Sequence, residues 1–215
     1  MKQNTKKFLE NLIKRLPCLE ICRSAIEQAF SILKECYSTG GKVLACGNGG
    51  SAADSEHIVG ELMKGFLLKR KIRKEDTDRL IKLYTKEGRI LAETLQGALP
   101  AISLVSHVSL NLAFINDVSP EMIFAQQVYG YGRQGDILIG ISTSGCAKNV
   151  VNALKIAKAF ELKTIGLTGE SGGVMRGLCD VTITVPSSDT YIVQEYHQSV
   201  YHTLCAMIEY EFFGT

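Results

Sequence analysis

The sequence predicts an α/β protein built as a three-layer αβα sandwich, with a five-stranded parallel sheet between two layers of helices. Five short apolar runs rich in β-forming residues alternate with helical patterns, and each run is followed by a turn signal. Near-continuous apolar strands are typical of parallel sheets that are covered on both faces. We therefore expect strands at residues 42–46, 101–105, 136–141, 163–167 and 181–185.

Two helices are expected before the first strand, at residues 3–15 and 19–37, where apolar residues recur at helical spacing. Pro17 separates the two segments, and Gly40-Gly41 ends the second. Residues 1–38 are therefore predicted to form an N-terminal helical addition. Charges are scattered among the apolar positions at the start of the chain, which indicates an amphipathic helix rather than a signal peptide.

Length and composition favour one folded domain over residues 1–215, because 46% of the residues are hydrophobic and 21% are charged. The net charge of +2 provides no overall field that would attract nucleic acid or an anionic membrane. Without an uncharged apolar run of 18 residues, no transmembrane helix is expected. Seven cysteines without a CxxC pair argue against zinc-ribbon and thioredoxin motifs and favour a reducing cytoplasm.

Residues 64–97 interrupt the alternation and are predicted to form a basic helical insertion. Residues 64–89 contain ten Lys or Arg and four Asp or Glu. The favoured interpretation is a helical excursion into solvent. The alternative is a basic lid or rim over an anionic substrate.

Small and hydroxylated residues follow three predicted strands, at the edge where open parallel sheets bind ligands. The loops are Gly47–Asp54, Ser142–Gly145 and Thr168–Gly173. Backbone N–H groups at helix N-termini, together with hydroxyls, suit a phosphate group. The first loop also fits the pattern Gly-x-Gly-x-x-Ala, but no strand ending in an acidic residue follows about 20 positions on, so a dinucleotide site is not expected.

Titratable residues occur in two further segments. His57 and Glu61 are four residues apart and share a helix face, while Gln194 and His202 belong to the last helical segment. Imidazole and carboxylate groups suit a divalent metal, and they equally suit proton transfer at carbon. His57 and Glu61 could also be a plain surface pair. If both residues are helical, Gln194 and His202 lie about 12 Å apart along the axis. They could then share a metal ion only if both side chains reach toward it from opposite ends. Otherwise Gln194 precedes the helix, or the two ligands come from different subunits.

Four ordered motifs between residues 20 and 212 resemble those of the sugar isomerase (SIS) domain family, closest to its isomerases of sedoheptulose 7-phosphate. The motifs are GNGGSAADSEH-x-x-x-E, STSG-x-x-x-N-V, LTGESGG and Q-E-x-H-x-x-x-x-H. The resemblance implies the SIS fold and a homotetramer with active sites at subunit contacts. It also implies an aldose–ketose isomerase that forms D-glycero-D-manno-heptose 7-phosphate through an enediol(ate), toward nucleotide-activated heptose for lipopolysaccharide or capsule.

The resemblance also implies roles for residues that match the motifs. The implied substrate-binding residues are Asn48, Gly49, Ser51, Asp117, Ser142, Thr143, Ser144 and Gln194. The implied ligands of one Zn²⁺ per subunit are His57, Glu61, Gln194 and His202. Glu61 and His202 are also the implied proton-transfer pair.

The sequence departs from the family pattern in three places, which bear on the identity of the sugar. Ala147 stands where many members have Ser, Ile192 where an Arg is common, and Lys64-Gly65 where Gly-Arg often follows Glu61. Two alternatives therefore stay open. One is an isomerase of another sugar phosphate, and the other is a non-catalytic SIS module that binds a sugar phosphate or a protein.

Overall fold

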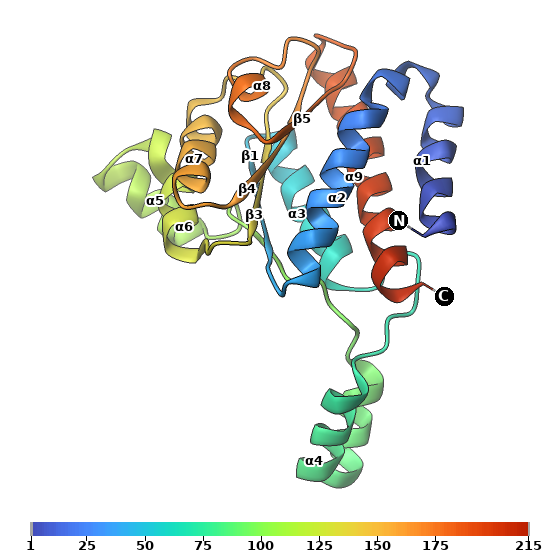
Figure 1. Cartoon of the computed structure of the whole chain (residues 1–215). Helices are drawn as coiled ribbons and strands as arrows, with labels where there is room; N and C mark the ends of the chain where they lie inside the picture. The colour runs from blue at the N-terminus through green and yellow to red at the C-terminus, as the bar shows by residue number, and fades with distance from the viewer. Residues whose placement is uncertain (1, 215) are drawn as a thin grey trace.

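The computed structural model describes residues 2–214 and contains one five-stranded, fully parallel sheet. The strand order is β2-β1-β3-β4-β5, with β3 at the centre (Figure 1). All five predicted strands are confirmed. Their bounds are β1 Val43–Gly47, β2 Ala101–Ser103, β3 Ile137–Ile141, β4 Lys163–Thr168 and β5 Val181–Thr184.

Helices cover both faces of the sheet, so the predicted three layers are confirmed. The larger core lies under four helices, which are α1 Gln3–Arg15, α2 Arg23–Ser38, α3 Gly50–Met63 and α9 Thr190–Phe213. The second core lies under α6 Ile123–Tyr131, α7 Lys148–Ala159 and α8 Met175–Leu178. The helix α5 Val108–Asp117 and the short turn η2 Pro120–Met122 lie beside α6 on this second side (Figure 1).

The N-terminal helices differ from prediction in one detail. Residues Pro17–Cys22 form a 3₁₀ turn, η1, and α2 begins only at Arg23. Proline has no N–H to donate and is favoured in the first turn of a helix, which explains why the chain restarts tightly at Pro17. Leu19 and Cys22 of η1 are still buried in the larger core, as their apolar spacing indicated.

The basic insertion forms α4 Lys74–Thr94, two helical arms joined by a kink at Thr85. Within the described chain, Gly88 is the one buried residue of α4, and α4 projects away from the rest of the molecule (Figure 1). Because α3 runs antiparallel to the strands, its end and the insertion lie at the edge opposite the strand-end loops. In one chain the insertion is therefore a solvated excursion, and it does not cover those loops.

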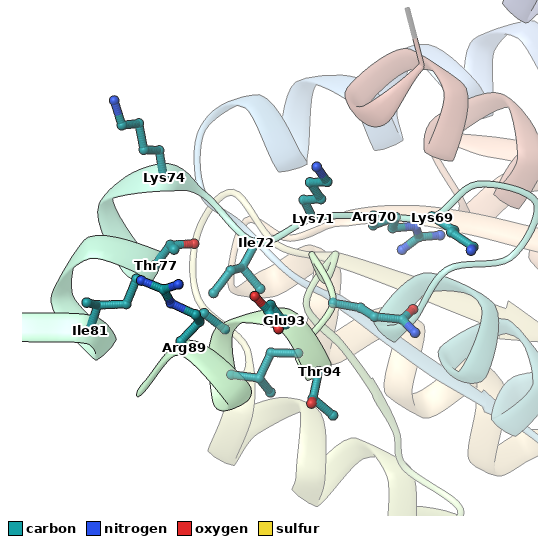
Figure 2. Close-up of a pocket in the computed structure, with 13 residues that line it drawn as sticks. Lys69, Arg70, Lys71, Ile72, Lys74, Thr77, Ile81, Arg89, Glu93 and Thr94 are labelled. Atoms are coloured by element: carbon teal, nitrogen blue, oxygen red, sulfur yellow. The ribbon is translucent and has the colours of Figure 1, made fainter. Parts of the chain in front are cut away.

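A pocket of about 730 Å³ lies at the root of the insertion (Figure 2). It is bounded by the segment that leaves α3 and by both arms of α4. Its lining residues are Lys69, Arg70, Lys71, Ile72, Lys74, Thr77, Ile81, Arg89, Ala92, Glu93, Thr94, Leu95 and Gln96. None of these residues belongs to the predicted site. Separately, none of the helices described over residues 2–214 is both long and apolar enough to cross a membrane.

Candidate active site

The loop after β1 meets the first turn of α7 through a pair of amides. Asn48 donates from Nδ2 to Asn149 Oδ1 at 2.8 Å, and Asn149 Nδ2 donates to Asn48 Oδ1 at 2.9 Å. Gly49 has a positive φ of 55°, a conformation that favours glycine, and it turns the chain into α3. The first turn of α3 therefore lies beside the start of α7, as expected for neighbouring strand ends.

The hydroxyl-rich loop after β3 is fixed by its own contacts. The Oγ atoms of Ser142 and Ser144 are 3.5 Å apart, and Ser144 Oγ accepts the Cys146 N–H at 3.2 Å. Thr143 accepts the Gly169 N–H through its backbone carbonyl at 2.9 Å, which joins this loop to the loop after β4. Ser51 and Ser142 are buried, whereas Ser144 is exposed. The predicted anion-binding loops therefore form one surface at the carboxyl edge of the sheet.

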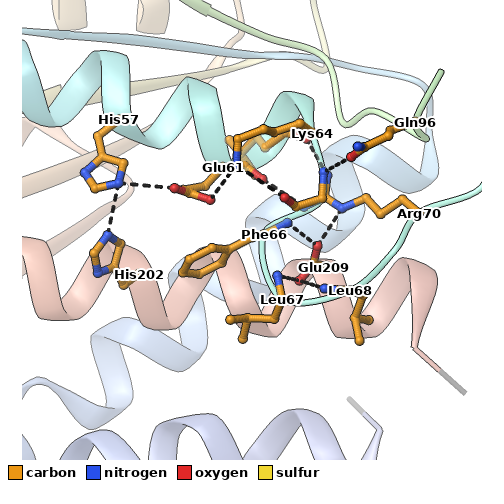
Figure 3. A network of polar contacts seen from close by, with 12 residues as sticks. His57, Glu61, Lys64, Phe66, Leu67, Leu68, Arg70, Gln96, His202 and Glu209 are labelled. Carbon is orange, nitrogen blue, oxygen red and sulfur yellow. Dashed lines mark hydrogen bonds and ion pairs between the residues drawn. The ribbon is translucent and has the colours of Figure 1, made fainter. Parts of the chain in front are cut away.

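Three of the four predicted metal or acid–base residues lie together between α3 and α9 (Figure 3). His57 Nε2 is 3.2 Å from Glu61 Oε1 and 3.4 Å from His202 Nε2. Glu61 Oε2 is buried and has no hydrogen-bond partner in the described chain, although Lys64 Nζ lies 3.6 Å away. The contact between α3 and α9 therefore brings an imidazole from each helix and one carboxylate together.

Tyr201 and Asp54 complete this cluster, and neither is among the site residues predicted from the sequence. The Tyr201 hydroxyl donates to Asp54 Oδ1 at 3.2 Å and lies 3.0 Å from His57 Nδ1. The Tyr201 hydroxyl therefore bridges Asp54 and His57 Nδ1, two polar groups of α3. Asp54 stands inside the first motif, and that position was the one available signal; nothing in the spacing singled out Tyr201.

Burial shifts the pKa values of this cluster. Burial and the neighbouring His57 lower the pKa of His202, while the Glu61 carboxylate opposes the shift. Burial raises the pKa of Asp54, against the opposing effects of the Tyr201 hydrogen bond and of His57. At neutral pH a lowered pKa keeps His202 uncharged, so its imidazole can exchange a proton or bind a metal.

Gln194 lies beside the cluster, in one pocket with Asp54, His57 and Tyr201. It lies inside α9, so the interpretation in which it precedes the helix is wrong, and it stands two turns before His202. Its amide packs on Gly50 so closely that a Cβ at residue 50 would collide with it. It shares with His57 a pocket of about 340 Å³ between α3 and α9.

The anion-binding loops and Asp117 lie apart from the cluster. Ser51 and Glu61 are ten residues apart on α3, about 15 Å along its axis. Asp117 is exposed at the end of α5, on the other side of the sheet. In one chain the carboxylate and imidazoles therefore converge, while the hydroxyl-rich surface stands at the far end of the same helix.

The donor chemistry of the cluster suits zinc, but one chain does not complete a zinc site. Imidazole nitrogens and a carboxylate oxygen are common zinc ligands. Over residues 2–214, however, no group of three His, Cys, Asp or Glu side chains is arranged to hold a metal ion. The cluster in one chain is a row of polar contacts with His57 in the middle, and the predicted fourth ligand, Gln194, lines the neighbouring pocket rather than standing in that row.

Comparisons with known proteins identify the family. Two family models described as SIS domain match residues 106–208 and 7–77. A phosphoheptose isomerase from Aliarcobacter butzleri is 40% identical, covering 96% of this chain and 95% of the relative. One from Clostridium acetobutylicum is 40% identical over 95% of this chain and 89% of the relative.

Solved structures agree. The phosphoheptose isomerase from Neisseria gonorrhoeae superposes with a TM-score of 0.73 at 31% identity, covering 95% of both chains. That from Francisella tularensis gives 0.72 at 31% identity, covering 97% of this chain and 99% of the other. The fold and the strand-end motifs define a sugar isomerase domain, and the chain belongs to the SIS-domain family. Within that family it is an isomerase that groups with the phosphoheptose isomerases.

Proposed function

We propose that this isomerase converts sedoheptulose 7-phosphate to D-glycero-D-manno-heptose 7-phosphate. The observation that carries the proposal is the convergence of Glu61 and His202, far apart in sequence, on the two sides of His57 Nε2. The names of the similar proteins support phosphoheptose as the substrate class. A module that only binds a sugar phosphate has no need for this pairing.

The cluster supplies the groups that a ketose-to-aldose conversion requires. A proton must leave C1, an enediol(ate) forms, and a proton returns at C2. Glu61 is the proposed base, because its Oε2 accepts no hydrogen bond from residues 2–214 and can take a proton. His202, kept neutral by its lowered pKa, is proposed to exchange a proton with the substrate oxygens.

Phosphate binding is proposed at the carboxyl edge of the sheet. Ser51, Ser142, Thr143 and Ser144 provide hydroxyls there, and α3 and α7 begin beside them. Asn48 and Gly49 belong to the same surface. Because this surface and Glu61 stand at opposite ends of α3, the proposal requires a long substrate or a contribution from a second subunit.

We also propose that Zn²⁺ binds at His57, Glu61 and His202, with Gln194 as the fourth ligand. His57 Nε2 lies 3.2 Å from Glu61 Oε1 and 3.4 Å from His202 Nε2, so three atoms of the kinds that bind zinc face one another. Zinc, when bound, would polarise the substrate oxygens. The steps assigned to Glu61 and His202 are derived from the side chains themselves.

A homotetramer is proposed because one chain leaves apolar surface uncovered and the site divided. No residue of α5 is buried in the described chain, and its exposed side chains include Val108, Leu112 and Ile115. Subunit contacts would cover this helix and could bring Gln194, Asp117 or the hydroxyl-rich surface of a second subunit to the cluster. The sugar phosphate is the one small-molecule partner proposed.

The proposed compartment is the cytoplasm, where the product would lead to nucleotide-activated heptose for lipopolysaccharide or capsule. All seven cysteines are free thiols, which agrees with a reducing environment. The departures at Ala147, Ile192 and Lys64-Gly65 favour, as a second candidate, the same reaction on another sugar phosphate.

Replacing Glu61 tests the proposal. Glu61→Gln keeps the shape of the side chain but removes the base, so we expect kcat to fall by about 10²–10⁴-fold while sugar phosphate binding, followed by calorimetry, persists. Glu56→Gln, at an exposed position on the same helix, is the control with unchanged turnover. Wild-type turnover on a panel of ketose phosphates identifies the sugar. A fully active Glu61→Gln enzyme would remove Glu61 from the mechanism.

A further inference from the structure

A buried ion pair lies where the basic insertion leaves α3. Arg70 Nε is 2.7 Å from Glu209 Oε1, and the two side chains are 0% and 1% exposed. Removing two charges from water is costly, and well-packed apolar side chains of similar size often stabilise a core as well. The pair therefore calls for an explanation other than packing.

Glu209 directs its carboxylate at a single short segment. Besides the Arg70 side chain, it accepts the backbone N–H groups of Phe66 and Leu67, each at 2.7 Å, and of Leu68 at 3.2 Å. Four donors thus converge on one carboxylate of α9. The backbone of residues 66–68 is thereby fixed against this helix.

Arg70 holds the end of α3 from the other side. Its Nη2 donates to the Glu61 carbonyl at 2.8 Å, and its Nη1 donates to the Leu62 carbonyl at 2.6 Å. The last carbonyls of a helix have no partner within it, and a cation stabilises that end. Arg70 therefore caps the turn of α3 from which the Glu61 side chain projects.

The segment fixed by Glu209 contacts the active-site cluster directly (Figure 3). The ring of Phe66 lies 5.6 Å from the ring of His202, centroid to centroid, at a tilt of 40°. His202 and Glu209 are seven residues apart, so they face the same side of α9. One carboxylate thus holds both the cap of the Glu61 turn and the ring that packs on His202.

We propose that Arg70 and Glu209 are positioning residues, which set the placement of Glu61 relative to His202 for proton transfer. The pair clamps the end of α3 to α9 and holds Phe66 on the His202 ring, and neither side chain belongs to the proposed substrate site. This inference rests on the proposed isomerase function. A displacement of the reacting groups by about 1 Å can cost about 100-fold in rate, so a rigid clamp has a direct catalytic effect.

The test compares Glu209→Gln with Asp136→Asn, a matched control. Asp136 is also a buried carboxylate that accepts two backbone N–H groups and a lysine, but its partners, Lys42 and Arg133, belong to neither α3 nor α9. We expect Glu209→Gln to lower kcat by about 10- to 100-fold with KM unchanged within about twofold, in protein that is folded at the assay temperature. Asp136→Asn should lower the melting temperature and leave kcat unchanged.

A second readout needs no turnover. The chain has four histidines, so the ring signals of His202 can be assigned in NMR spectra of the metal-free protein by single substitutions. Phe66→Leu removes the aromatic ring and should move the His202 signals. Glu209→Gln should move them in the same direction, and Asp136→Asn should not.

The outcomes are distinguishable. If Glu209→Gln and Arg70→Lys melt earlier but keep kcat and the His202 signals, the pair is structural and the proposal fails. If Glu209→Gln does not fold, Phe66→Leu decides, since it leaves the ion pair in place; unchanged kcat there refutes the role of Phe66 in positioning. If the wild-type enzyme turns over no heptose phosphate, the proposed function fails. The NMR comparison still tests whether Arg70 and Glu209 hold Phe66 against the His202 ring.

Discussion

Tyr201 links two polar side chains of α3 from its place on α9. Its hydroxyl donates to Asp54 and lies 3.0 Å from His57 Nδ1, so it orients the His57 ring. His197, in the same motif as His202, has a different role. It is completely buried, and burial lowers its pKa to about 4, so it is a neutral core residue at pH 7.

Removing the Tyr201 hydroxyl should weaken the proposed zinc site. Tyr201→Phe leaves Asp54 and His57 Nδ1 without their shared partner, and loss of such an outer hydrogen bond typically costs 10–100-fold in metal affinity. We expect a drop of about tenfold, measured by competition with a chromophoric chelator. Tyr196→Phe on the same helix is the control. Equal zinc affinity of the Tyr201 variant and the wild type would separate Tyr201 from metal binding.

Glu211 predicts a pH dependence of stability. Burial alone would raise its pKa, but hydrogen bonds from the Lys2 backbone, Lys34 and Thr5 outweigh burial and lower the pKa to about 2. An unfolded Glu titrates near 4.3, so the stabilisation is complete above that pH and is lost as the pH falls toward 2. Its size is about 3 kcal/mol.

Urea unfolding of wild type and Glu211→Gln at several pH values checks this. The difference in unfolding free energy should be full at pH 6 and should shrink steadily between about pH 4.3 and pH 2. Glu27→Gln, exposed on α2, is the control. A difference that stays constant down to pH 2 would contradict the assignment.

Among the helices, α4 of the basic insertion stands apart from the two hydrophobic cores. Its two ends are tied together at the root, where Gly65 N–H donates to Gln96 Oε1 at 2.7 Å and Gly97 N–H donates to the Arg70 carbonyl at 3.1 Å. Beyond these bonds, α4 contributes no residue to either core, as described over residues 2–214. The basic character of α4 therefore has no structural role within one chain.

Replacing residues 75–93 by a short Gly-Ser linker should leave the fold intact, because the root bonds and Arg70 are kept. We expect the melting temperature to change by only a few degrees and KM for the sugar phosphate to stay within twofold. Calorimetry and steady-state kinetics measure both. A large rise of KM without a fall in melting temperature would instead favour the alternative in which the basic insertion forms a rim over the anionic substrate.

For the whole molecule, α5 is the helix whose apolar side chains are most clearly left exposed by one chain. Leu112 is 61% exposed and stands among other exposed apolar side chains of the same helix. Contiguous apolar surface of this kind marks an interaction site. The proposed tetramer is the simplest way to cover it, because closed symmetric assemblies are the commonest oligomers of soluble proteins.

Leu112→Glu should therefore dissociate the assembly. A charge placed in an apolar subunit contact loses its hydration, so light scattering should show smaller species, with a parallel loss of activity. Ile21→Glu, at a position 69% exposed on η1, is the control. A tetramer that survives Leu112→Glu unchanged would exclude α5 from the subunit contact.

The layers, the five strands, the hydroxyl-rich loops and the pairing of His57 with Glu61 could be predicted from the amino-acid sequence, because they follow from periodicity and from spacing along one element. Packing in three dimensions brings His202 to that pair, places Gln194 in the pocket beside it, and surrounds it with Tyr201, Asp54, Arg70 and Glu209. These contacts depend on how α3 packs against α9, and the packing of two helices distant in sequence is set by the whole core rather than by either segment.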